Sequence, residues 1–294
     1  MLQDQEALIS LGNVRQWVRV AGTVHATVPL VVLHGGPGGN HWVFERTAGR
    51  LLEQHRTVVY YEQRGCGRSE AAEDPSADSY HVLIEDVLAL IDWLGVPAVD
   101  LLGYSFGGGL ALEVARVNPQ RIRHVVVQAP AFHLADPEIA KSQIAGLTWA
   151  ARGETADRIR RLDVPDLDRR LDAIWSLVDI ETVDRFLFQD TEHARRNRSG
   201  WAESGLVNTG DLARALSQQP PPAVADHLPD IQRPVLVVSG RHDRNVPLSF
   251  TQQVAEQLPW AKLVVFEHSA HFPDIEETET FVETVLTFLE SPMG

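Results

Sequence analysis

One serine in the chain stands in a pattern that suits nucleophilic catalysis. Ser105 lies in Gly103-Tyr-Ser-Phe-Gly107, which fits the pattern G-x-S-x-G. The pattern is informative here because an apolar stretch precedes it and a helical pattern follows, which places the serine in a tight turn between a strand and a helix. Glycines two residues before and two residues after the serine leave room for such a turn. The alternative is a glycine-rich turn that holds an incidental serine.

A serine hydroxyl becomes a useful nucleophile only when a base takes its proton, and an acid usually orients that base. Asp243 lies in the loop Ser239-Gly-Arg-His-Asp-Arg-Asn-Val-Pro247, after an apolar stretch. His271 lies in Glu267-His-Ser-Ala-His-Phe-Pro273, after the next apolar stretch. A G-x-S-x-G serine is followed along the chain by its acid and then by its base. The sequence therefore predicts Ser105 as nucleophile, Asp243 as acid and His271 as base.

The choice of His271 has to be weighed, because the chain has 12 histidines. His268, three residues earlier, is the nearest rival. His271 is favoured because Phe-Pro follows it and a helical pattern begins shortly afterwards. No pair of histidines stands at helical spacing with a carboxylate, so we expect no metal site, and no motif indicates a cofactor.

Acyl transfer through a serine also needs donors for the negative charge that develops on the carbonyl oxygen. The amide of Phe106, directly after the serine, is the first candidate. The loop His34-Gly-Gly-Pro-Gly38 follows an earlier apolar stretch and offers a second amide. We expect Gly36 to supply it, with Gly35 next, because a glycine lets the oxygen approach the backbone closely. Taken alone, this loop is equally compatible with a simple turn.

The elements that must position these residues alternate between strand and helix. Leu8–Val20 alternates apolar and polar residues as a half-exposed antiparallel strand pair does. Later apolar stretches predict buried parallel strands, at Pro29–Leu33, Thr57–Tyr61, Ala98–Leu102, Ile122–Val127, Pro234–Ser239 and Lys262–Phe266. Helical patterns lie between and after them, at Leu83–Leu94, Ser105–Val117, Phe250–Leu258 and Phe281–Leu289. This order predicts a mostly parallel sheet with helices on both faces and the three side chains at the carboxyl ends of strands.

The alternation is interrupted between about Pro130 and Pro220-Pro-Pro222. Helical patterns dominate this stretch, for example over Ala140–Ala151 and Leu171–Phe188. We therefore expect an α/β core formed by residues 1–130 and 226–294, interrupted by a helical cap of residues 131–225. The cap should stand over the carboxyl edge of the sheet.

Three segments together resemble the α/β-hydrolase superfamily and, within it, the proline iminopeptidase-like peptidases. They are the His34-Gly-Gly-Pro-Gly38 loop, Gln63-Arg-Gly-Cys-Gly-Arg-Ser69 and the turn around Ser105. In the family an Asp precedes the second segment, where this chain has Glu62. The resemblance covers roughly residues 10–130 and 230–290 and implies a helical cap over the active site.

The resemblance also implies release of an N-terminal amino acid, with cap carboxylates that hold the free α-amine of the substrate. In one branch of the family the residue after the acid is acidic and helps to bind that amine, whereas here it is Arg244. Among the acidic residues of the expected cap, Glu203 and Glu192 are the candidates for binding the substrate amine. A solvated helix charge is the alternative for each of them.

Composition limits the other classes of function. The net charge of −14 disfavours a nucleic-acid binder, which would carry a basic face. Cys66 is the single cysteine, so no internal disulfide can form. No apolar run approaches the roughly 20 residues that span a bilayer, and the first residues lack a secretory signal pattern. We expect a cytoplasmic protein that binds neither membrane nor nucleic acid.

The leading hypothesis is a serine hydrolase that releases an N-terminal amino acid from a short peptide or small aminoacyl amide through an acyl-enzyme. An esterase or lactonase acting on a small-molecule ester is the alternative, because Arg244 weakens the argument for amine binding. A non-catalytic ligand-binding protein on the same scaffold is a third hypothesis, since fold alone does not determine function.

Overall fold

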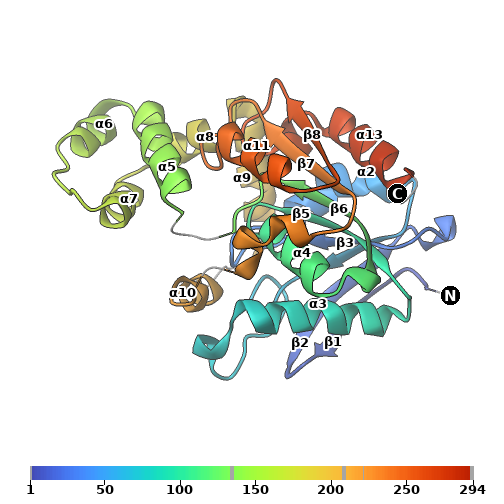
Figure 1. Cartoon of the computed structure of the whole chain (residues 1–294). Coiled ribbons are helices and arrows are strands. Elements are labelled where there is room, and N and C mark those ends of the chain that lie inside the picture. Colours follow the sequence, from blue (N-terminus) through green and yellow to red (C-terminus); the bar gives the residue numbers. More distant parts are fainter. Residues whose placement is uncertain (1, 133–135, 207–209, 221, 292–294) are drawn as a thin grey trace.

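The part of the chain that the structure describes contains one sheet of eight strands (Figure 1). This computed structural model describes residues 2–132, 136–206, 210–220 and 222–291. The strands are β1 (Gln5–Leu11), β2 (Val14–Ala21), β3 (Leu30–Leu33), β4 (Val58–Tyr61), β5 (Val99–Tyr104), β6 (Ile122–Gln128), β7 (Val235–Gly240) and β8 (Ala261–Phe266). Their order across the sheet is β1-β2-β4-β3-β5-β6-β7-β8. The hairpin of β1 and β2 joins β4 in antiparallel orientation, and all later neighbours are parallel. The predicted mostly parallel sheet is confirmed.

Helices cover both faces of this sheet, as its buried strands require. Helices α3 (Tyr80–Leu94), α4 (Phe106–Val117) and α11 (Leu248–Gln257) pack on one face. Helices α1 (Trp42–Phe44), α2 (Arg50–Leu52) and α13 (Thr278–Leu289) pack on the other. Strand β3 shows why two cores form: Val31 and Leu33 point into the first, whereas Leu30 and Val32 point into the second.

A run of helices interrupts the alternation between β6 and β7. It comprises α5 (Pro137–Ala150), α6 (Gly153–Arg160), α7 (Leu167–Trp175), α8 (Ile180–Leu187), α9 (Thr191–Ser204) and α10 (Asp211–Ser217). We call residues 137–217 the insert. No described residue of the insert belongs to the sheet, and α5, α6 and α7 stand away from it in Figure 1. Residues 133–135, 207–209 and 221 of the expected cap range lie outside the described residues.

The single helical stretch expected over Leu171–Phe188 is two helices, α7 and α8. Asp179 starts the second helix, because its side chain accepts a hydrogen bond from the amide of Thr182 at 2.7 Å. Leu177 and Val178 lie in the break but pack against the insert's own apolar cluster, so the apolar pattern continues while the helix does not. Periodicity alone does not reveal such a short interruption.

Candidate active site

Ser105 occupies a sharp turn between β5 and α4. Its backbone φ is +53° and ψ is −124°, and its amide donates to the carbonyl oxygen of Gln128 at 2.8 Å. The turn leaves no space for side chains on either side. A Cβ at Gly103 would lie 2.1 Å from the oxygen of Gly107, and one at Gly107 would lie 2.1 Å from the oxygen of Leu33. The two glycines of the motif are therefore required by close backbone approach.

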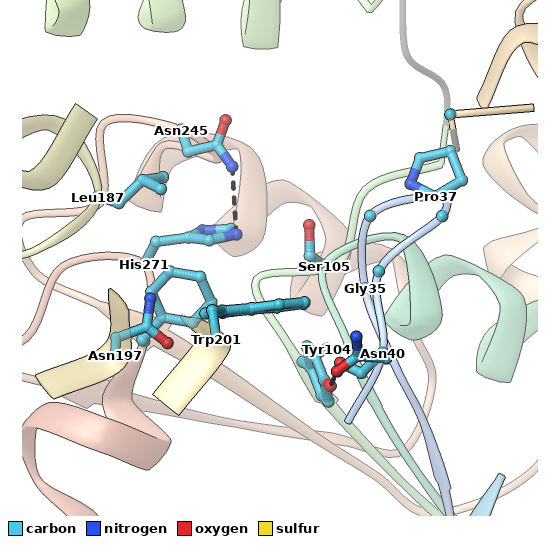
Figure 2. A pocket seen from close by; sticks show the side chains of 15 residues that line it. Gly35, Pro37, Asn40, Tyr104, Ser105, Leu187, Asn197, Trp201, Asn245 and His271 are labelled. Carbon is cyan, nitrogen blue, oxygen red and sulfur yellow. Dashed lines mark hydrogen bonds between the residues drawn. The ribbon is translucent and has the colours of Figure 1, made fainter. Parts of the chain in front are cut away.

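The expected base and acid form a buried pair. Nδ1 of His271 lies 2.8 Å from Oδ2 of Asp243, and only 4% and 7% of these residues are exposed. The other carboxylate oxygen accepts the backbone amides of Asn245 and Val246 at 2.8 Å and 2.9 Å. Because Asp243 accepts at Nδ1, the imidazole carries its hydrogen there and has its lone pair on Nε2. Ser105 and His271 face the same cavity, as Figure 2 shows.

The loop His34–Gly38 is locked to the segment that follows β4. The buried ring of His34 accepts the amide of Gln63 at Nε2, at 3.0 Å, and the Gln63 side chain donates to the His34 carbonyl oxygen at 3.0 Å. Burial lowers the pKa of His34 and so favours its neutral ring. Gly36 lines the cavity, and the Phe106 amide, being the first in α4, has no acceptor within the helix. Both amides remain the predicted donors for an oxyanion.

The Gln63–Ser69 segment acts as scaffold for this loop. Arg64 pairs with Asp86 and Asp78 in a buried cluster. Glu62 is fully buried and accepts two hydrogen bonds from the guanidinium of Arg68, at 2.8 Å and 3.1 Å. Burial raises the pKa of the Cys66 thiol to about 12, which leaves it a packing residue rather than a nucleophile.

The cavity at Ser105 has a volume of about 430 Å³ and neutral walls. Among the described residues that line it, none is an aspartate, glutamate, lysine or arginine. Most of its polar and aromatic walls could not be recognised from sequence motifs, because they come from loops and from the insert. Beside Ser105, His271 and the loop from Gly35 to Gly39, the lining residues are Asn40, Tyr104, Leu187, Asn197, Trp201, Gly210, Asn245 and Phe272.

Glu192 and Glu203, expected to bind an amine, do not line this cavity. Both are exposed and line a different hollow with Trp42 and Arg46, on the other side of α9. Helix geometry gives the reason: Glu203 stands two residues after Trp201, which is about 200° around the helix axis. Glu192 also pairs with Arg196. The structure therefore places neither carboxylate at Ser105.

Arg244, the residue after the acid, points into the insert rather than into the cavity. Its guanidinium stacks on Trp149 of α5 and donates to the side-chain oxygen of Gln189 at 3.2 Å. Gly146 permits this approach, because a Cβ there would lie 2.6 Å from the Cβ of Arg244. Arg244 thus ties the loop after β7 to α5 and to the segment after α8.

Residues 2–132, 136–206, 210–220 and 222–291 contain no group of three or more histidine, cysteine, aspartate or glutamate side chains that could hold a metal ion. No helix within those ranges is long and apolar enough to cross a bilayer.

Comparison with known proteins agrees with this fold. A family model described as alpha/beta hydrolase fold matches residues 28–278. A proline iminopeptidase of Clostridioides difficile (strain 630) is 26% identical and covers 97% of this chain and 98% of its own. A 2-hydroxymuconate semialdehyde hydrolase of Pseudomonas sp. (strain CF600) is 28% identical, over 90% of this chain and 87% of its own. A solved structure of a proline iminopeptidase-related protein of Thermus thermophilus superposes with a TM-score of 0.76 and 26% identity over 98% of each chain.

Proposed function

The chain belongs to the α/β-hydrolase fold family, and from that membership and the side chains that meet at the cavity we propose that it is a serine hydrolase. The observation that carries the proposal is the His271–Asp243 hydrogen bond of 2.8 Å beside the strained turn of Ser105. A base held in one tautomer, with its lone pair toward the cavity, is what a serine nucleophile requires.

The reaction follows from these positions. Ser105 Oγ attacks the substrate carbonyl while His271 Nε2 takes its proton, and the amides of Gly36 and Phe106 hold the oxyanion. The imidazolium then gives the proton to the leaving group, and an acyl-enzyme remains. Water, activated by the same nitrogen, releases the acid. Asp243 orients the ring through Nδ1 and stabilises the imidazolium in both halves.

The neutral cavity favours a small uncharged ester or lactone as substrate. An ammonium group that leaves water for a closed cavity needs a charged partner, and no described residue that lines this cavity supplies one. Leu187, Trp201 and Phe272 offer apolar walls, while three asparagine amides offer neutral hydrogen-bonding groups.

The aminopeptidase expected from the sequence is the second candidate. It is supported by the proline iminopeptidase relatives, which match over 86% to 99% of this chain. With Glu192 and Glu203 on the far side of α9, it would have to bind the substrate amine through neutral groups.

Two measurements test the proposal. A fluorophosphonate probe should label the wild-type protein and leave Ser105→Ala unlabelled, and the variant should lose turnover by several orders of magnitude while it stays folded. A protein that binds ligands but shows neither labelling nor turnover would instead be a non-catalytic member of the fold.

The substrate class is decided by kcat/KM for p-nitrophenyl acetate and butyrate beside proline p-nitroanilide and its N-acetyl form. We expect the esters to be hydrolysed best and the acetyl form of the amide to be no worse than the free amine. A clear preference for the free amine would make the aminopeptidase the correct assignment.

A further inference from the structure

The nitrogen that must accept the serine proton is already engaged in the structure. Nδ2 of Asn245 lies 3.1 Å from Nε2 of His271, and Figure 2 marks this bond with a dashed line. Because Nδ1 gives its hydrogen to Asp243, Nε2 is an acceptor and the amide of Asn245 is the donor. Ser105 needs the same lone pair for its own hydroxyl hydrogen.

The orientation of Asn245 is fixed from the insert. Its Oδ1 accepts a hydrogen bond from Nε2 of Gln143 on α5, at 2.8 Å, and this leaves the amino end of the amide toward the imidazole. The backbone amide of Asn245 donates to Asp243 Oδ1, at 2.8 Å. Asn245 therefore contacts the acid, the base and the insert at once.

We propose that Asn245 is a positioning residue that holds Nε2 of His271 in competition with Ser105, and that α5 sets this hold through Gln143. The inference rests on the proposed serine-hydrolase function. While Asn245 Nδ2 donates to Nε2, His271 cannot accept the serine proton. A substrate that enters the cavity has to displace the asparagine amide before Ser105 can lose its proton.

The hold also depends on the protonation state of the ring. Only the neutral imidazole can accept from Asn245 Nδ2, because the imidazolium carries a hydrogen on Nε2. Turning the asparagine amide over would set its amino group against that of Gln143. The Gln143–Asn245 pair therefore favours neutral His271, and its removal favours the imidazolium.

Of the charged and titratable groups around His271, only Asp243 bonds its ring, at Nδ1. In α12 (Pro273–Glu276), Asp274 accepts from the side chain of Gln128 and Glu276 from backbone amides. Arg244 stacks on Trp149, and His193 pairs with Asp190 within the insert. Among the residues that the structure describes, Asn245 alone hydrogen-bonds Nε2 of His271.

The test is the rate of Ser105 phosphonylation by a small fluorophosphonate, measured across pH without substrate. In this step the Oγ–P bond forms, the P–F bond breaks, fluoride leaves and Nε2 takes the serine proton. In Asn245→Ala we expect the rate above the acid limb to rise about threefold to tenfold, the equivalent of one neutral hydrogen bond. We expect the acid limb to move about half a unit to one unit higher in pH.

Gln143→Ala is the second variant, because it leaves the cavity wall intact and only releases the orientation of Asn245. Gln143→Ala should also raise the phosphonylation rate and move the acid limb to higher pH, but by less than Asn245→Ala does. Asn197→Ala is the matched control: it removes an asparagine from the same cavity, one that the structure does not bond to His271, and should leave the acid limb in place.

The results distinguish the serine-hydrolase function from the role of Asn245. Absence of labelling in the wild-type protein would overturn the proposed function itself. Normal labelling of the wild type, with folded Asn245→Ala and Gln143→Ala variants that react no faster and keep the wild-type acid limb, would overturn the role of Asn245 alone.

Discussion

The guanidinium carbon of Arg244 lies 3.9 Å from the centroid of the Trp149 ring. One residue belongs to the loop that carries the acid Asp243, and the other to helix α5 of the insert. Partial burial between these elements lowers the pKa of Arg244, and its guanidinium contacts the ring and donates to Gln189. The contact therefore links the core to the insert through Arg244.

Arg244→Ala should therefore destabilise the protein by about 1–2 kcal/mol, the range for a partly desolvated cation–π contact with its packed stem. Urea unfolding measures this loss. Arg152→Ala is the control, because that guanidinium lies 5.8 Å from the same ring and is exposed. Equal losses in the two variants would contradict the role of Arg244.

The strands could be predicted from the sequence because they depend on local patterns. The apolar stretches that predict β3, β4 and β7 agree with the observed strands to within one residue at each end. Ser105, Asp243 and His271 each follow a strand whose carboxyl end lies at the same edge of the sheet, so topology alone brings them together.

The residues that form the walls of the cavity could not be predicted from local sequence patterns. Asn197 and Trp201 come from α9, and which side of that helix faces Ser105 depends on how the insert packs on the core. Helix α9 has few apolar residues, so its residue pattern marks an inner face only weakly. The contact between Asn245 and His271 likewise depends on packing between distant segments.

His271→Ala should lower kcat by several orders of magnitude. No other described side chain both hydrogen-bonds Asp243 and lines the cavity at Ser105. His268→Ala is the matched control: His268 is exposed, and its backbone amide, which the substitution keeps, donates to Glu277. Steady-state rates on the best ester decide the matter. A dead His268→Ala enzyme beside an active His271→Ala enzyme would reverse the assignment.

Trp201 lies between the cavity at Ser105 and a second hollow of about 450 Å³, and the two share Leu187, Asn197 and Trp201 as walls. Trp201→Ala should join them and admit longer acyl chains. Each methylene that becomes buried contributes about 0.8 kcal/mol, so kcat/KM for p-nitrophenyl octanoate relative to the acetate should rise at least about tenfold. Trp260→Ala, at an exposed tryptophan directly before β8, should leave that ratio unchanged. An unchanged ratio in Trp201→Ala would show that the two hollows stay apart.

Asp274 is a buried acid three residues after His271, and it does not line the cavity. Its Oδ1 accepts from the side chain of Gln128 at 2.7 Å, and burial raises its pKa to about 6. The folded-state pKa is thus above the value of about 3.9 for an unfolded aspartate. Its contribution to stability is fully present below about pH 4 and is lost as the pH rises through about 6.

Asp274→Asn cannot ionise, and an asparagine Oδ1 can still accept from Gln128. The free energy of unfolding of the variant minus that of the wild type should therefore rise by about 2 kcal/mol between about pH 4.5 and about pH 7.5, whatever its value at the lower pH. Urea titrations of both proteins at several pH values give this difference directly. Asp157→Asn, at an exposed carboxylate of α6, should give a nearly flat difference over the same range. If the difference in free energy of unfolding for Asp274→Asn is also independent of pH, the pKa of Asp274 is the same in the folded and unfolded chain. Burial would then not destabilise its charged form.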